Sequence, residues 1–171
     1  QKDLPTTSWK PISPAARTQL KQKLGDLLSW WKRTQRRRFS LLFARAGQSW
    51  LKVPYERRSL DISQPEQLIV RTDKLGCVDF IELSLALART AHCGIHTVNA
   101  LQRELTDLRY RSGIIAGYQS RLHYFSEWLD QATRRGALVD LSRALGGKPI
   151  KRPFSWMSDH PQFYPPLRNP R

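Results

Sequence analysis

The chain has 171 residues, of which 40% are hydrophobic and 10% aromatic. This apolar content is enough for one compact core, and the chain is too short for two full domains. This composition excludes a disordered chain, a collagen and a coiled coil. Twenty-nine Lys and Arg residues against 14 Asp and Glu give a formal charge of +15, which favours polyanionic surroundings such as nucleic acid, anionic lipid or a bacterial envelope. Cys77 and Cys93 are too few for a disulfide scaffold, and no apolar stretch approaches the roughly 20 residues of a membrane helix.

The first 60 residues hold most of the charge excess, with 14 basic and 3 acidic residues. Ser13 followed by Pro14 is a typical helix start. Apolar residues then recur at helical spacing: Leu20, Leu24, Leu27, Leu28 and Trp31. We therefore predict an amphipathic basic helix within a basic N-terminal extension, residues 1–38. Its charged face could follow a phosphate backbone, but charged helix faces are usually just solvated, so specific nucleic-acid binding is not predicted.

The remaining chain, residues 39–171, predicts further helices. A helix over about 39–51 should end before Pro54, because a proline disfavours helical backbone at the residue before it. Residues 67–71 form a strand candidate. Residues 97–110 carry another helical period.

The segment 77–89 is apolar on nearly every side, which is typical of a helix in the middle of a domain. Its polar exceptions are Asp79, Glu82 and Ser84. We expect this central helix to need covering on several sides, and the proline-rich last 25 residues to supply only extended or turn structure. An isolated chain should therefore expose apolar surface.

Cys77 is the strongest candidate for a chemical role, because it follows a turn and opens the buried helix. Free backbone N–H groups and the helix dipole stabilise a thiolate at such a position. The alternative is a small buried hydrophobic residue, as most free cysteines are. The segment from His92 to His96 lacks the second Cys of a haem attachment site and the spacing of a zinc site, so no metal or other cofactor is predicted.

The segment 109–128 combines Arg, Tyr, His and Trp, the residue types that bind carboxylates and stack on sugars or bases. A packed surface pair of helices is the alternative reading.

Several of these stretches occur in an order and spacing that resemble domain-of-unknown-function family 1460, over residues 39–167. They are Leu51 to Tyr55, Cys77 to Glu82 with Leu85 to Ala88, Leu108 to Gly113, Tyr118 to Trp128 and Met157 to Pro161. That family is an N-acetylmuramoyl-L-alanine amidase-like group within the NlpC-type papain-like cell-wall hydrolases.

The resemblance implies an α+β papain-like fold of which this chain covers a mostly helical part, the N-terminal and helical-insertion portion. It implies a bacterial peptidoglycan hydrolase that cleaves the N-acetylmuramoyl-L-alanine amide or a stem-peptide amide, acting on peptidoglycan fragments or muropeptides. Cys77 matches the nucleophile, and the segment 109–128 matches an insertion that walls the substrate cleft. The expected substrate-binding residues are Tyr55, Arg109, Tyr110, Arg121, His123 and Tyr124. A periplasmic or secreted location is expected, with a signal peptide already removed before Gln1.

Two departures from the family pattern follow. Gly76 and Asp79 stand where the family usually has Asp and Thr, and a carboxylate so near the nucleophile opposes thiolate formation. The family's general-base His lies on a β-strand well beyond Pro161, so we expect the β-sheet half to be missing from this chain, with His123 as a weak substitute base. The alternatives are a basic helical module that binds nucleic acid or another polyanion, and an inactive remnant of the amidase family.

Overall fold

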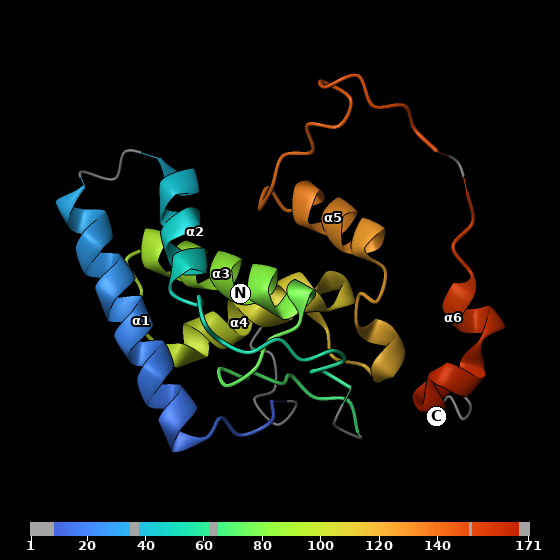
Figure 1. The fold of residues 1–171 in the computed structure, drawn as a ribbon, viewed down its shortest axis with the longest axis horizontal. Coiled ribbons are helices and arrows are strands. Elements are labelled where there is room, and N and C mark those ends of the chain that lie inside the picture. Colours follow the sequence, from blue (N-terminus) through green and yellow to red (C-terminus); the bar gives the residue numbers. More distant parts are fainter. Residues whose placement is uncertain (1–8, 35–37, 62–64, 151, 168–171) are drawn as a thin grey trace.

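The computed structural model describes residues 9–34, 38–61, 65–150 and 152–167 (Figure 1). The main helices are α1 (Pro14–Arg33), α2 (Phe39–Gln48), α3 (Cys77–His92), α4 (Val98–Arg109) and α5 (Phe125–Arg134). The short ones are α6 (Trp156–Asp159) and the 3-10 turns η2 (Arg111–Gly113), η3 (Tyr118–Ser120), η4 (Pro161–Phe163) and η5 (Pro165–Leu167). Extended pairing within the described residues is limited to isolated bridges. The prediction of a mostly helical chain is confirmed.

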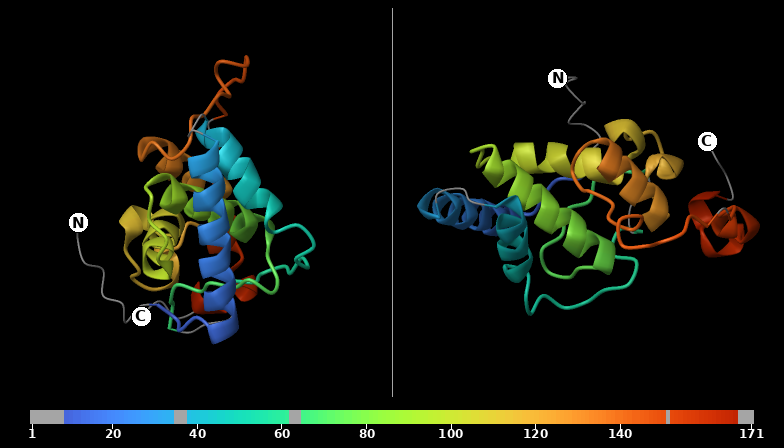
Figure 2. Two further views of the ribbon diagram at one scale, coloured as in Figure 1. Left: turned by 90° about the vertical axis from the view of Figure 1, so that its left-hand side faces the viewer. Right: turned by 90° about the horizontal axis from the view of Figure 1, so that it is seen from above.

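Helix α3 lies at the centre of the molecule, with α1, α2 and α4 packed against it (Figures 1 and 2). The side chains from Leu83 to Ala88 are all at most 1% exposed. The buried helix predicted over 77–89 is therefore confirmed and continues to His92. Among the described helices, none combines the length and apolar character needed to cross a bilayer.

Helix α1 starts as its sequence predicts. The Ser13 Oγ accepts a hydrogen bond from the Ala16 N–H at 3.2 Å, and Pro14 is the first helical residue. Its apolar stripe, including Leu20 and Trp31, is buried in the same core as α3. The helix of the basic extension thus belongs to the main core.

Two predicted elements are shorter than expected. Helix α2 ends at Gln48, three residues early, because the chain turns there, with Lys52 in the left-handed region at a φ of 73°. The strand predicted over 67–71 is reduced to a single parallel bridge between Leu68 and Trp9. No longer strand lies beside it in the described chain, and the next carbonyl, that of Ile69, binds a side chain instead.

A buried ion pair joins α3 to the end of α4. The Arg109 Nε donates to the Glu82 carboxylate at 2.7 Å, and both side chains are at most 3% exposed. A second guanidinium N–H donates to the Ile69 carbonyl at 2.5 Å. Burial raises the pKa of Glu82, and the charge of Arg109 opposes this rise. One guanidinium therefore ties α3, α4 and the 65–75 loop together.

The exposed apolar surface lies away from the central helix. The segment 137–150 extends from the end of α5 as an arm without regular secondary structure (Figure 1). Val139, Leu145 and Ile150 on this arm are each about four-fifths exposed. Apolar exposure was expected because α3 would lack cover. In fact α1, α2 and α4 cover α3, and the most exposed apolar side chains of the described residues are those of the arm, most of which precedes the proline-rich last 25 residues.

We expect the Glu82–Arg109 pair to behave as a coupled unit. Arg109→Met should lower the free energy of unfolding by about 3–5 kcal/mol, because it leaves a buried carboxylate unpaired. Adding Glu82→Leu should recover most of that loss. Urea unfolding of the two single variants and the double variant measures the coupling; simple additivity of the two losses would contradict a direct pair.

We also expect the arm to bind a hydrophobic dye. Replacing Leu141, Leu145 and Ile150 by Ser should lower dye fluorescence while leaving the melting temperature nearly unchanged, because these side chains lie outside the core. Leu87→Ala, in the core, is the matched control and should lower stability by about 2–5 kcal/mol. A large drop in melting temperature for the arm variant would show that the arm packs against the core.

Candidate functional site

Cys77 is the first residue of α3, and its thiol is free and exposed. Gly76 is the N-cap. A Cβ at Gly76 would lie 3.3 Å from both the Glu56 carbonyl oxygen and the Ser59 hydroxyl, so glycine suits the close approach of this loop. The helix that follows is buried, so the exposed thiol lies at the end of a rigid element.

Asp79 caps the helix that Cys77 opens. Its carboxylate accepts the Gly76 N–H at 2.9 Å and the hydroxyl proton of Ser59, and the residue is buried. This is the carboxylate half of a capping box, placed where the dipole favours negative charge. Asp79 thus does more than oppose a thiolate: it fixes the loop 56–59 against the start of α3.

A pocket of about 340 Å³ opens beside Cys77. Five parts of the chain line it: the loop 55–61, the start of α3, Arg109 at the end of α4, the segment 118–123, and the tail at Met157 and Tyr164. Of the predicted site residues, the pocket therefore brings together Tyr55, Cys77, Arg109, Arg121 and His123. Tyr110 and Tyr124 are not among the described residues that line it.

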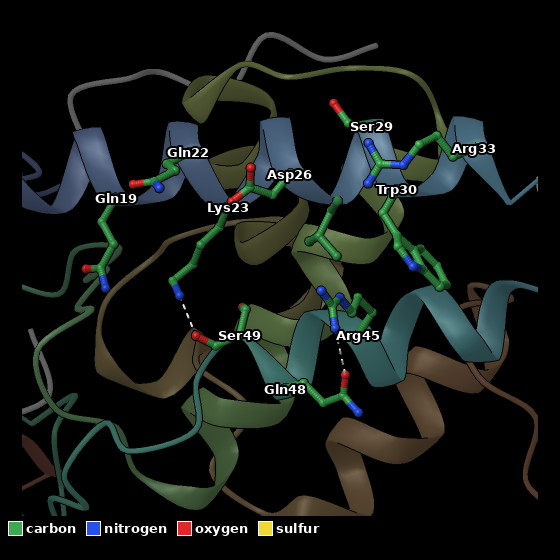
Figure 3. Close-up of a pocket in the computed structure, with 11 residues that line it drawn as sticks. Gln19, Gln22, Lys23, Asp26, Ser29, Trp30, Arg33, Arg45, Gln48 and Ser49 are labelled. Atoms are coloured by element: carbon green, nitrogen blue, oxygen red, sulfur yellow. Dashed lines mark hydrogen bonds between the residues drawn. The ribbon is translucent and has the colours of Figure 1, made fainter.

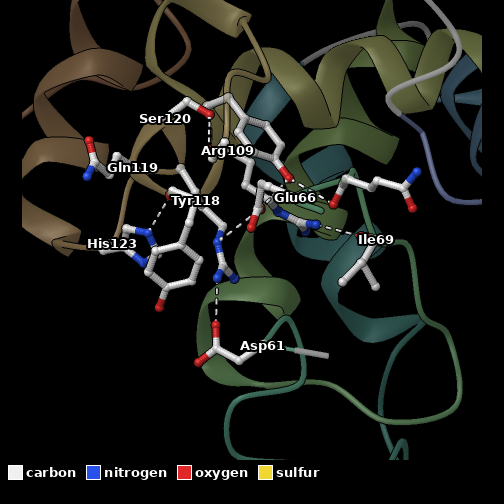
Figure 4. A network of polar contacts seen from close by, with 12 residues as sticks. Asp61, Glu66, Ile69, Arg109, Tyr118, Gln119, Ser120 and His123 are labelled. Atoms are coloured by element: carbon white, nitrogen blue, oxygen red, sulfur yellow. Dashed lines mark hydrogen bonds and ion pairs between the residues drawn. The ribbon is translucent and has the colours of Figure 1, made fainter. Parts of the chain in front are cut away.

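Arg109, Tyr110 and Arg121 are occupied by protein partners (Figure 4). Arg109 is 2% exposed and paired with Glu82, as described above. The Tyr110 hydroxyl lies 2.9 Å from a Glu66 carboxylate oxygen and donates to one of the two acceptors at hand, Glu66 or the Gln67 carbonyl.

Arg121 completes this network. Its guanidinium donates to Asp61 at 2.6 Å, lies 3.3 Å from Glu66 and stacks over the Tyr118 ring at 4.9 Å (Figure 4). Burial raises the pKa of Glu66, and the positive charge of Arg121 opposes this rise. The network braces Asp61 and the loop 65–69 against the segment 109–121, so these three residues position the pocket wall. Direct binding of substrate by them stays a prediction.

Tyr55 is well placed to touch a ligand, because its side chain is 69% exposed at the pocket rim. Tyr124 is not in the described pocket lining, and its hydroxyl accepts a hydrogen bond from the N–H of the lining residue Met157 at 2.9 Å. Sequence reasoning missed Arg57 and Arg58, both exposed in the lining. Arg58 has a φ of 58° and its guanidinium lies 5.9 Å from the Tyr164 ring centroid. Two adjacent arginines just after the Pro54-Tyr55 motif were the available signal.

His123 is the histidine in the pocket lining. Its Nε2 lies 2.8 Å from the Tyr118 carbonyl oxygen, so this nitrogen carries the proton and Nδ1 is the acceptor. Burial lowers the pKa of His123 to about 4, so the ring is neutral at pH 7 and a weak base. Within the described residues no hydrogen bond joins it to Cys77.

The other histidines lie elsewhere. His92 packs against Trp31 at the far end of α3, about 22 Å along the helix axis from Cys77. His160 stacks on Trp156 in the tail. Among the described residues, no cluster of His, Cys, Asp and Glu could hold a metal ion.

Solved structures resemble this chain over much of its length. An N-acetylmuramoyl-L-alanine amidase from Bacteroides uniformis ATCC 8492 is 32% identical, with a TM-score of 0.66, and the match covers 86% of this chain and 55% of that one. A Bacteroides fragilis protein provisionally named a xylanase is 36% identical, with a TM-score of 0.63, covering 72% of this chain and 54% of that one. The chain thus spans about half the length of these relatives. No curated protein matches it significantly.

The family model of AmiA-like, N-acetylmuramoyl-L-alanine amidase-like proteins matches residues 45–169. The matched region begins in α2 and includes the pocket, Cys77 and the tail, whereas α1 lies before it. Because this match takes in most of the sequence, the chain belongs to the N-acetylmuramoyl-L-alanine amidase-like family.

Proposed function

We propose that this chain provides the nucleophile and one wall of the substrate cleft of a bacterial peptidoglycan amidase. The observation that carries the proposal is the exposed thiol of Cys77 at the first residue of a buried helix, beside a pocket of about 340 Å³. Family membership supplies the substrate class. The finer assignment, to family 1460 and the papain-like NlpC type, is part of this proposal.

The chemistry is acyl transfer. The Cys77 thiolate attacks the carbonyl carbon of the amide, the C–N bond breaks, and the amine leaves with a proton. Water then hydrolyses the thioester, releasing a carboxylate and restoring the thiol. In the N-acetylmuramoyl-L-alanine amide, the products are an alanyl amine on the peptide and a carboxylate on the sugar.

The reaction needs a base that accepts the thiol proton and returns it to the amine. His123 is nearby but a weak base, for the reasons given above. The proposal therefore assigns the base to a histidine outside residues 1–171, with His123 as the alternative inside the chain.

Substrate contacts are assigned to the exposed residues of the pocket rim, Tyr55, Arg57 and Arg58. Guanidinium groups bind carboxylates in two-point geometry, and stem peptides carry carboxylates. Arg109, Tyr110 and Arg121 act as positioning residues. Peptidoglycan lies outside the cytoplasmic membrane, so a periplasmic or secreted location belongs to the proposal.

Replacing the nucleophile tests the proposal. In the full gene product, Cys77→Ser should abolish release of stem peptide from muropeptides, whereas Cys93→Ser should leave it nearly unchanged. Cys93 is the matched control, because it is also a free, exposed thiol. Chromatography of the released peptides measures the activity; the reverse pattern would remove Cys77 from the mechanism.

Thiol reactivity tests the helix-terminus argument without needing the base. Iodoacetamide should label Cys77 before Cys93, and Asp79→Asn should speed Cys77 labelling further. Asn keeps an oxygen to accept the Gly76 N–H while removing the negative charge. Peptide mass spectrometry follows both sites, with Cys93 as the internal reference. Slower labelling in the variant would mean that the cap matters more than the charge.

A further inference from the structure

A second concave surface lies between α1 and α2, and Cys77 is not among its lining residues. This α1–α2 groove has a volume of about 710 Å³ (Figure 3). Its lining residues are Gln19, Gln22, Lys23, Asp26, Leu27, Ser29, Trp30, Arg33, Arg45, Gln48 and Ser49. The residues from α1 recur every three or four positions along one helix face, from Gln19 to Arg33, which makes the groove about 21 Å long.

Three basic side chains bring positive charge to the groove. Lys23 and Arg33 from α1 and Arg45 from α2 point into the space between the helices (Figure 3). None of the three forms an ion pair with a described residue. Asp26 is the single acidic residue in the described lining.

The two ends of the groove differ. At one end, Lys23 donates to the Ser49 carbonyl and lies 4.4 Å from the Trp50 ring centroid, so its position is fixed. At the other end, the partly buried Trp30 lies near Arg33 and Arg45 (Figure 3). The part of an indole ring that lines a groove beside two guanidinium groups can stack on a ligand ring while the guanidinium groups donate hydrogen bonds to its anionic groups.

Neutral and acidic hydrogen-bonding groups line the rest of the groove. Asp26, Ser29 and Gln22 are exposed, as is Gln48, whose amide oxygen accepts a hydrogen bond from the Arg45 guanidinium at 3.4 Å (Figure 3). Carboxylate and amide oxygens accept hydrogen bonds, which a ligand rich in hydroxyl groups can donate. A bare polyphosphate has no such donors and would leave these acceptors unused. A ring-bearing, hydroxylated and anionic chain matches every part of the groove.

We propose that the α1–α2 groove binds a linear glycan that carries carboxylates. The sugar rings stack on Trp30, their hydroxyl groups bind the acceptors, and the carboxylates bind Arg33 and Arg45. The natural ligand rests on the proposed function, because cleavage of the muramoyl amide leaves a carboxylate on the glycan strand. The groove would then hold that strand away from the cleft.

Binding of defined probes tests this proposal independently of catalysis. Hyaluronan oligosaccharides supply N-acetyl sugars and carboxylates in alternation, while polyphosphate supplies charge without rings. Fluorescence anisotropy of labelled probes gives the affinity, using the full chain with Cys77→Ser so that no reaction occurs.

The double variant Arg33→Gln with Arg45→Gln should weaken hyaluronan binding by about tenfold or more. The matched control, Lys21→Gln with Lys32→Gln, removes the same charge from another face of α1. It should change the affinity for hyaluronan by less than about twofold. Trp30→Leu keeps an apolar side chain against the core. It should weaken the binding of hyaluronan but not the binding of polyphosphate.

Three results would overturn the proposal. One is an equal loss in the groove and control variants, which would mean general attraction by net charge. Another is hyaluronan binding that Trp30→Leu and the arginine variant both leave unchanged. The last is tighter binding of a single-stranded oligonucleotide than of hyaluronan at equal charge, which would identify a nucleic-acid surface. An absence of amidase activity in the full gene product would contradict the proposed function but would leave the measured binding of hyaluronan to the groove unaffected.

Discussion

The ion pair between Glu82 and Arg109 is the interaction on which the rest of the structure depends. Helix α3 is so apolar that its whole middle is buried, and Glu82 is buried with it. A lone carboxylate in that position would cost several kcal/mol. Arg109, at the end of α4, forms an ion pair with this carboxylate and also donates a hydrogen bond to the Ile69 carbonyl. The start of α3 is therefore held where two helices and a loop meet.

The second carboxylate of α3 serves the site more directly. Asp79 satisfies the Gly76 N–H and binds Ser59, so the loop that carries Tyr55 and Arg58 is fixed beside Cys77. Burial begins within the first turn of the helix, yet the Cys77 thiol remains exposed. The same packing that stabilises α3 thus presents the Cys77 thiol at a defined place.

Some arginines of this protein hold parts of the fold together through buried ion pairs, whereas others are exposed and form no ion pair with a described residue. Arg109 and Arg121 are buried and paired with carboxylates, so they build the wall of the pocket. Arg57 near Cys77 and Arg33 in the α1–α2 groove are exposed and form no ion pair with a described residue. Exposed arginines of this basic chain therefore lie on two surfaces with separate lining residues, the pocket beside Cys77 and the α1–α2 groove.

The sequence alone determined the features that depend on neighbours in the chain. Ser13 with Pro14, the period of 97–110 and the apolar run after Cys77 each specify a helix through local capping and spacing, and all three are present. The position of Cys77 at a helix N-terminus follows from the same local signals. The family resemblance rested on motifs near these elements, and the match over residues 45–169 supports its coarser part.

Only the tertiary structure decided how distant residues meet. The segment 67–71 has strand-forming side chains but finds one bridge partner, so it does not become a strand. Arg109 and Tyr110 are residue types that bind ligands, yet their partners are Glu82 and Glu66, which lie 27 and 44 residues away in the chain. Local pattern cannot reveal such partners, because burial and charge pairing are set by which surfaces the folded chain brings together.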